Sequence, residues 1–154
     1  MPSYKVHLVG GLLTYLGILH IIKHTDPTIH TIVQGLLFCL LGALFPDIDV
    51  KSKGQKVFYT LLLFFLLYLV AVKKYCLFVC VSFLGLIPIL VRHRGLFHHI
   101  WFLLVMALVA TLGVKMMCGS YEQMMIHNCW FFFAGSVSHV VLDRVCSRLK
   151  RYFS

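Results

Sequence analysis

Six apolar stretches, separated by short polar segments, dominate this chain of 154 residues. Hydrophobic residues make up 60% of the sequence and charged residues only 12%, against roughly half and a quarter in an ordinary soluble domain. A chain with so few charges has too little polar surface for a soluble fold, so the sequence predicts one membrane-embedded domain over residues 1–154. The stretches cover residues 6–22, 31–45, 57–72, 75–91, 96–118 and 124–146.

These stretches favour helices over strands. About 20 helical residues cross a hydrocarbon core of roughly 30 Å, and no alternation of polar and apolar residues supports a transmembrane β-barrel. The predicted fold class is therefore all-α, a polytopic membrane helical bundle with about six transmembrane helices. The second stretch is the weakest, because its residues rise only about 22 Å as a helix. Five transmembrane helices with a short or re-entrant second helix are thus the alternative.

The basic residues predict the orientation. The chain has 14 Lys and Arg against five Asp and Glu, a formal net charge of +9. These cations lie in small groups between apolar stretches, which is typical of membrane-span flanks and argues against nucleic-acid binding. In a six-span topology most of them lie on the side of the N-terminus, so both termini are predicted to be cytoplasmic. The exceptions are Lys23, Lys73, Lys74 and Lys115.

Acidic and histidine side chains converge on that same side. Asp47 and Asp49 follow the second stretch, and Asp143 closes the sixth. A carboxylate at the end of an apolar span is costly without a partner. The candidate partners on this side of the membrane are His7, His93, His98, His99 and His139. Four separate segments thus reach one membrane depth, which predicts a single shared site.

Local spacing supports this hypothesis. His139 and Asp143 are four residues apart, so both side chains can point into one crevice from a helix. Pro46 disfavours helix at the preceding residue, so Asp47 and Asp49 are expected to leave the helix in an extended segment, where side chains two apart face the same way.

Imidazole nitrogens and carboxylate oxygens together suit Zn²⁺, Mn²⁺ or Fe²⁺. Gly95 can supply the bend that lets His93 and His98 approach one another. The candidates exceed what one tetrahedral ion needs, so one or two divalent ions are predicted, with zinc favoured. Two simpler interpretations stay open, since Asp143 could pair with Arg94 or Arg144 and His7 could be an ordinary interfacial histidine. The candidate metal ligands are His7, Asp47, Asp49, His93, His98, His139 and Asp143.

The order of these motifs resembles a known family. A histidine in the first span, Pro46-Asp47-Ile48-Asp49, His93-Arg94-Gly95 followed by His98, and Ser138-His139 with Asp143 look like the membrane-bound metal-dependent hydrolases of the YdjM type, also described as LexA-binding, inner-membrane-associated hydrolases. The resemblance implies that the seven candidates are metal ligands and that the protein lies in a bacterial inner membrane. The chain departs from the family pattern at Phe97-His98-His99, where members usually read Thr-His-Ser.

The leading functional hypothesis is a hydrolase that acts on an ester or phosphoester of a membrane lipid or lipid-linked substrate at the cytoplasmic interface. A bound metal would activate a water molecule for attack. Arg94 would stabilise the developing negative charge, because its planar donors suit oxyanions. His99 is the candidate general acid. Asp47 or Asp49 could bridge two ions while the other carboxylate orients a histidine.

Two other classes of function remain as alternatives. A metal-ion or proton-coupled transporter would use a second polar cluster on the opposite side, which supplies a second station on a pathway. A structural protein could use the metal only for folding, although the ligand set exceeds a closed four-coordinate site. The residues of the second cluster are His20, His24, Asp26 and His30, with His127 as a further member.

Overall fold

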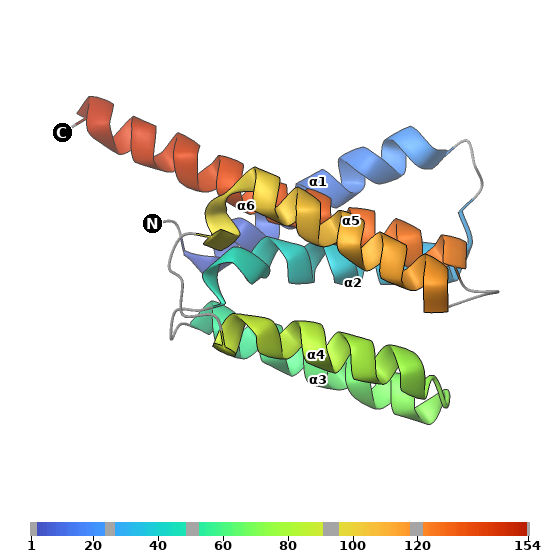
Figure 1. Ribbon diagram of the computed structural model, residues 1–154. Helices are drawn as coiled ribbons and strands as arrows, with labels where there is room; N and C mark the ends of the chain where they lie inside the picture. Colours follow the sequence, from blue (N-terminus) through green and yellow to red (C-terminus); the bar gives the residue numbers. More distant parts are fainter. Residues whose placement is uncertain (1–2, 24–26, 49–52, 91–95, 118–121, 154) are drawn as a thin grey trace.

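The computed structural model describes residues 3–23, 27–48, 53–90, 96–117 and 122–153. Within these ranges the chain is helical and contains no strand, which confirms the predicted all-α membrane bundle. Two 3-10 turns, η2 (Phe45–Asp47) and η3 (Leu96–His98), come before α3 and α5. The α-helices are α1 (Tyr4–Ile22), α2 (Ile29–Leu44), α3 (Lys53–Ala71), α4 (Tyr75–Leu90), α5 (Ile100–Met117) and α6 (Glu122–Phe153), as drawn in Figure 1.

Four helical segments of the described chain are long and apolar enough to cross a membrane, and the shorter apolar helix α5 adds to them. The second stretch is one of the four, because η2 continues α2 into a helical segment of 19 residues, Ile29–Asp47. This length favours a full span over a short or re-entrant second helix. Helix α6 continues past the end of the sixth apolar stretch, near residue 146, and runs to Phe153. The basic C-terminal part of α6 stays helical because Arg and Leu are good helix formers.

Helices α2 and α6 form the centre of the bundle. They make the most extensive contact in the described chain, and α1 packs against both of them. Helix α5 packs along α6, while α3 and α4 form a hairpin that joins the rest through α2 and η2. Figure 1 shows this hairpin as a separate layer, and the C-terminal end of α6 projecting beyond the bundle. The outward faces carry exposed apolar side chains such as Val9, Phe64 and Phe83, as expected of surfaces in contact with lipid.

Small residues let α2 and α6 approach closely. A Cβ added at Gly42 would overlap the backbone carbonyl oxygen of Phe132, and one added at Gly135 would overlap that of Cys39. The backbones of the two helices are therefore in direct contact at two points about one turn apart on each helix. Close packing of this kind drives helix association in lipid, where the hydrophobic effect between helices is absent.

Polar contacts strengthen the same central group of helices. The Tyr15 hydroxyl of α1 donates a hydrogen bond to the Ile32 carbonyl of α2 at 2.8 Å. The buried Asn128 side chain of α6 donates through Nδ2 to Gln34 Oε1 of α2 at 2.9 Å. Such bonds between membrane helices contribute roughly 0.6 kcal/mol on average, so they support the packing and do not replace it.

Gly135→Ala should lower the thermal unfolding temperature of the protein in mild detergent by several degrees. The added methyl group must push α6 away from the Cys39 carbonyl, and overpacking of this kind costs about 1–3 kcal/mol. Gly113→Ala in α5 is the matched control, because no atom lies within 4 Å of a Cβ at that position. Equal unfolding temperatures for the two variants would show that the α2–α6 contact does not limit stability.

Candidate metal centre

The end of α2 presents Asp47 through a tight turn. Pro46 lies in the first turn of η2, where a backbone N–H has no required partner and the fixed φ of proline suits a helix start. The extended segment predicted from Pro46 is therefore wrong as far as Ile48, whose backbone is helical and whose N–H donates to the Phe45 carbonyl at 3.1 Å. Burial of Phe45 and Ile48 holds this turn in place. Gln55 of α3 adds a hydrogen bond to the Ile48 carbonyl at 2.8 Å.

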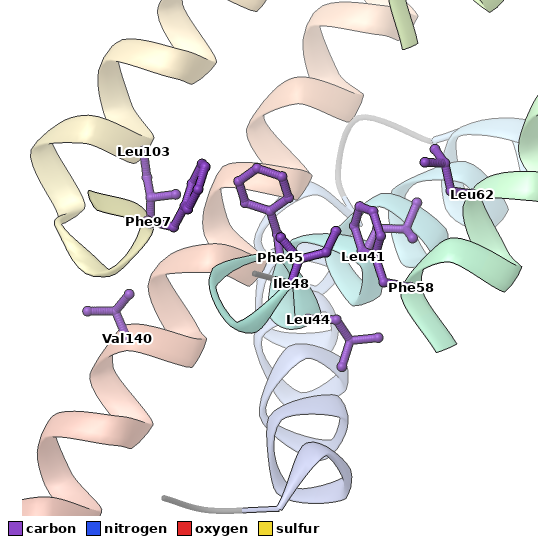
Figure 2. Close-up of a cluster of buried hydrophobic side chains, with 9 residues drawn as sticks. All are labelled: Leu41, Leu44, Phe45, Ile48, Phe58, Leu62, Phe97, Leu103 and Val140. Atoms are coloured by element: carbon purple, nitrogen blue, oxygen red, sulfur yellow. The ribbon is translucent and has the colours of Figure 1, made fainter. Parts of the chain in front are cut away.

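An aromatic cluster joins this turn to η3, which carries His98. The Phe45 ring meets the Phe97 ring edge to face, with centroids 5.2 Å apart, and the Phe132 ring of α6 at 5.1 Å. Phe97 is only 1% exposed and also contacts Phe102 of α5. Figure 2 shows Phe97 and Phe45 side by side in the buried core. Since Phe97 immediately precedes His98, its burial fixes the position from which the imidazole reaches the site.

Helix α6 supplies His139 and Asp143 from one face, as their spacing of four residues predicts. His139 is fully buried, and its Nδ1 lies 2.7 Å from the Ala43 carbonyl oxygen of α2. A carbonyl oxygen only accepts, so Nδ1 is the protonated nitrogen, and Nε2 offers a lone pair to the site. This contact is typical of a metal-binding histidine, whose other nitrogen donates to a carbonyl or carboxylate.

The side chains from η2, η3 and α6 meet in a ring in which carboxylates and imidazoles alternate. His98 Nε2 lies 3.4 Å from Asp47 Oδ1 and 3.3 Å from Asp143 Oδ2. His139 Nε2 lies 3.5 Å from each of these two oxygen atoms. One donor atom from each of the four residues falls within 4.8 Å of every other. Among the described residues, this is the group with the composition and spacing of a metal site.

The spacing of the four donors fits a shared divalent ion. Ligand atoms about 2.0–2.1 Å from one ion lie about 2.9 Å apart at a right angle and about 3.3 Å apart at the tetrahedral angle. Buried polar atoms point the same way, because Asp47 Oδ1, His139 Nε2 and Asp143 Oδ1 make no hydrogen bond within the described part of the chain. Two carboxylates this close repel one another. A bound dication would offset this repulsion and would also provide a partner for the buried atoms that lack a hydrogen bond.

His7 lies directly beside this ring of donors. It comes from the first turns of α1, is 1% exposed, and stacks its ring on that of His139 with centroids 3.7 Å apart. Its Nε2 is 3.6 Å from Asp143 Oδ1. Neither ring nitrogen of His7 has a hydrogen bond within the described residues. His7 is thus no ordinary interfacial histidine, and its nitrogen atoms are available for a further ligand next to the four-donor ring.

The structure brings together five of the seven predicted ligands, namely His7, Asp47, His98, His139 and Asp143. Three other predicted site residues, Asp49, His93 and Arg94, lie outside the described residues, as does Gly95. His99 is not part of the ring of donors. Its side chain is exposed and its ring lies near that of Trp101, with centroids 6.3 Å apart.

The second histidine cluster gives a different result. His24 and Asp26 lie outside the described residues, and the side chains of His20, His30 and His127 are exposed. No group of metal-ligating side chains among the described residues includes these three histidines. The part of the chain that the structure describes therefore adds no support to a pathway with two stations.

Two supports of the site could not be predicted from the sequence. The Ala43 carbonyl that orients His139 has no side-chain signal, and only the small residues around it hint that a backbone could come so close. Phe97 departs from the family pattern in the sequence, and in the structure it is among the most buried large side chains of the described chain. An aromatic residue immediately before a candidate ligand was the available signal.

Comparisons with known proteins place the chain in a family. Residues 1–149 match the family model of the YdjM inner membrane protein, so the chain belongs to that family. The curated proteins and the solved structures gave no match. The family description supports an inner-membrane location and names no reaction.

Asp47→Asn and His139→Ala should each remove stoichiometric metal from protein purified in mild detergent, as measured by elemental mass spectrometry. Each change takes one donor from the shared ring, and the loss should exceed the roughly 10–100-fold effect of altering a residue behind the ligands. His30→Ala is the control, because that histidine is exposed and lies at the start of α2, whereas Asp47 follows the end of this helix. Full metal content in both ring variants would rule out the shared site.

Phe97→Leu should weaken metal binding without changing any ligand. The smaller side chain leaves a void beside Phe45 and frees η3 to move, so the metal dissociation constant should rise by about 10-fold or more. Phe83→Leu, at a side chain that is 70% exposed, is the matched control. A metal titration in detergent with unchanged affinity for Phe97→Leu would exclude a positioning role for this ring.

Proposed function

We propose that this member of the YdjM inner membrane protein family is a membrane-embedded metal-dependent hydrolase that cleaves an ester or phosphoester of a lipid or lipid-linked substrate. One observation carries the proposal, the partly buried ring of two carboxylates and two imidazoles at one end of the bundle. A site made only to stabilise the fold would be closed by four donors, whereas His7 adds a fifth donor residue in direct contact with the ring. An extra donor suits a centre that must also accommodate a water or a substrate oxygen.

The residues present would hold the ion through Asp47, His98, His139 and Asp143. When bound, a divalent ion supplies Lewis acidity and an activated water at neutral pH. The two carboxylates balance the charge of one dication, so the loaded centre is near neutral and costs less to bury. The Ala43 carbonyl holds His139 in one tautomer, which keeps its Nε2 lone pair aimed at the centre.

The other roles come from the sequence. Arg94 follows His93 and precedes the glycine before η3, a position from which its guanidinium would stabilise negative charge on a phosphoryl or acyl oxygen. Asp49, two residues beyond Asp47, would bind a second ion or orient a ligand histidine. His99, next to His98 and exposed, would protonate a leaving group when substrate covers it.

We place the centre at the cytoplasmic face of the inner membrane, with both termini on that side. The ring forms where α2 ends and α5 begins, and the same end of the bundle carries exposed basic residues, among them Lys53, Arg144 and Arg148. The positive-inside rule assigns such an end to the cytoplasm. The positive charge also draws anionic headgroups toward the centre, which favours a phosphate-bearing lipid as substrate.

Asp143→Asn should lower the rate of hydrolysis of a lipid phosphoester at least about 100-fold. The change removes a carboxylate from the ring of donors, and this carboxylate is also the partner of His7. The assay measures phosphate released from phosphatidic acid in mixed micelles, with zinc or manganese added. His127→Asn, at an exposed histidine outside the ring, should keep the wild-type rate. Wild-type protein that carries stoichiometric metal and hydrolyses no ester or phosphoester lipid would contradict the proposed function.

Arg94→Lys tests the role of the guanidinium separately from metal binding. The variant should retain its metal while losing most of the hydrolytic rate, by about 10²-fold, because an ammonium group cannot offer two parallel donors to an oxyanion. Both quantities are measured on the same purified sample. An equally active Lys variant would remove Arg94 from the mechanism and leave the metal centre untouched.

A further inference from the structure

An apolar cavity of about 110 Å³ lies inside the bundle, next to the turn that carries Asp47. Helices α2, α3, α4, α5 and α6 all contribute to its wall. The lining is almost entirely hydrocarbon and aromatic ring, and includes Phe45, Phe65, Val81, Ala110 and Phe132. Cavities of this composition stay dry and accept apolar molecules.

The bundle leaves this cavity accessible from the side. Along the described chain, α4 makes extended contact only with α3, and α5 makes it only with α6 and η3. The α3–α4 hairpin and the α5–α6 pair therefore flank α2 without packing closely on one another. The wall on either side includes small residues, Gly85 of α4 and Ala107 and Ala110 of α5. In a membrane, what lies outside such an opening is lipid hydrocarbon.

Phe45 connects the cavity to the metal centre. Its ring forms part of the cavity wall, and its backbone starts the turn that ends two residues later at Asp47. Phe132 likewise lines the cavity and lies on α6 two turns before His139. The polar head and the chain end of an amphiphile that reached both places would thus lie on opposite sides of these two rings.

We infer that the cavity binds a single hydrocarbon chain of the amphiphilic substrate, whose phosphate or ester head lies at the metal centre. The identification of the bound molecule as the substrate rests on the proposed function. The chain site itself rests on the cavity and the residues around it. The size of the cavity selects among apolar groups. A volume of about 110 Å³ is smaller than the roughly 150 Å³ that holds a benzene ring, so the cavity takes only the end segment of one narrow chain and excludes a fused ring system.

The test uses a 12-carbon alkyl phosphate that carries a photoreactive diazirine near the end of its chain. The full-length, zinc-loaded protein is reconstituted in phosphatidylethanolamine and phosphatidylglycerol vesicles, illuminated, and analysed by peptide mass spectrometry. Labels are expected on the cavity side of α5 and α6, at Met106 or Cys129, and unlabelled dodecyl phosphate should displace them at least about tenfold better than dodecane does.

Two variants of one residue fill the cavity. Ala110→Phe should reduce the labelling of cavity residues at least about fivefold, and the smaller Ala110→Leu should do the same in part, should the larger ring hinder folding. Val109→Phe is the matched control on the same helix, because Val109 is 63% exposed on the outer face. Labelling that stays unchanged in both Ala110 variants, or that falls on the exposed face of α5, would overturn the inference.

The connection to the metal centre is tested by Asp47→Asn. This variant should still be labelled in the cavity but should lose the preference for dodecyl phosphate over dodecane, because only the head group reaches the ring of donors. Equal competition by the two compounds in the zinc-loaded wild type would show that the chain site is independent of the centre and would overturn the inference. Labelling as expected without hydrolysis of any phosphoester would overturn the proposed function and leave the chain site standing.

Discussion

The direct backbone contact between α2 and α6 is the constraint on which the rest of the structure depends. Two glycines, Gly42 and Gly135, remove the side chains that would otherwise hold these helices apart. Because the helices touch, the Ala43 carbonyl comes within hydrogen-bond distance of His139, one turn beyond Gly135. The contact thus sets both the tautomer and the position of His139, a candidate metal ligand. In a soluble protein this geometry could be held by hydrophobic collapse, but in lipid it relies on packing without side chains in between.

Electrostatics explains why the polar residues gather where they do. A carboxylate near the end of a membrane span loses most of its hydration, and it must be compensated by a cation or by donors. Asp47 and Asp143 meet this demand together with two imidazoles, although neutral imidazoles cannot balance two negative charges. The buried rings of Phe45 and Phe97 pack against each other and hold the segments that carry Asp47 and His98 in place. A rigid apolar support of this kind holds the polar side chains in one geometry.

Much of the fold and of the site could be predicted from sequence because both follow from one-dimensional patterns. The apolar stretches predicted six helices whose ends, except the C-terminal end of α6, lie within a few residues of those observed, and alternate crossing brought His7, Asp47, His98 and His139 to one end. What failed was local. Pro46 signals the end of α2, yet the sequence does not reveal that burial of its neighbours keeps the next turn helical. The apolar stretch does not reveal the full length of α6, because hydropathy reports where the membrane ends, whereas a helix ends where its backbone hydrogen bonds do.

Contacts between distant segments set the remaining limit. The edge-to-face pair of Phe45 and Phe97 joins positions 52 residues apart, and neither residue differs in sequence from the many other phenylalanines of the chain. Yet Phe45 adjoins two environments, since the turn that it begins carries Asp47 and its ring lines the apolar cavity. A molecule that occupies both environments must itself be polar at one end and apolar at the other. The aromatic layer therefore does more than stabilise a turn, because it defines the boundary at which an amphiphilic ligand would change character.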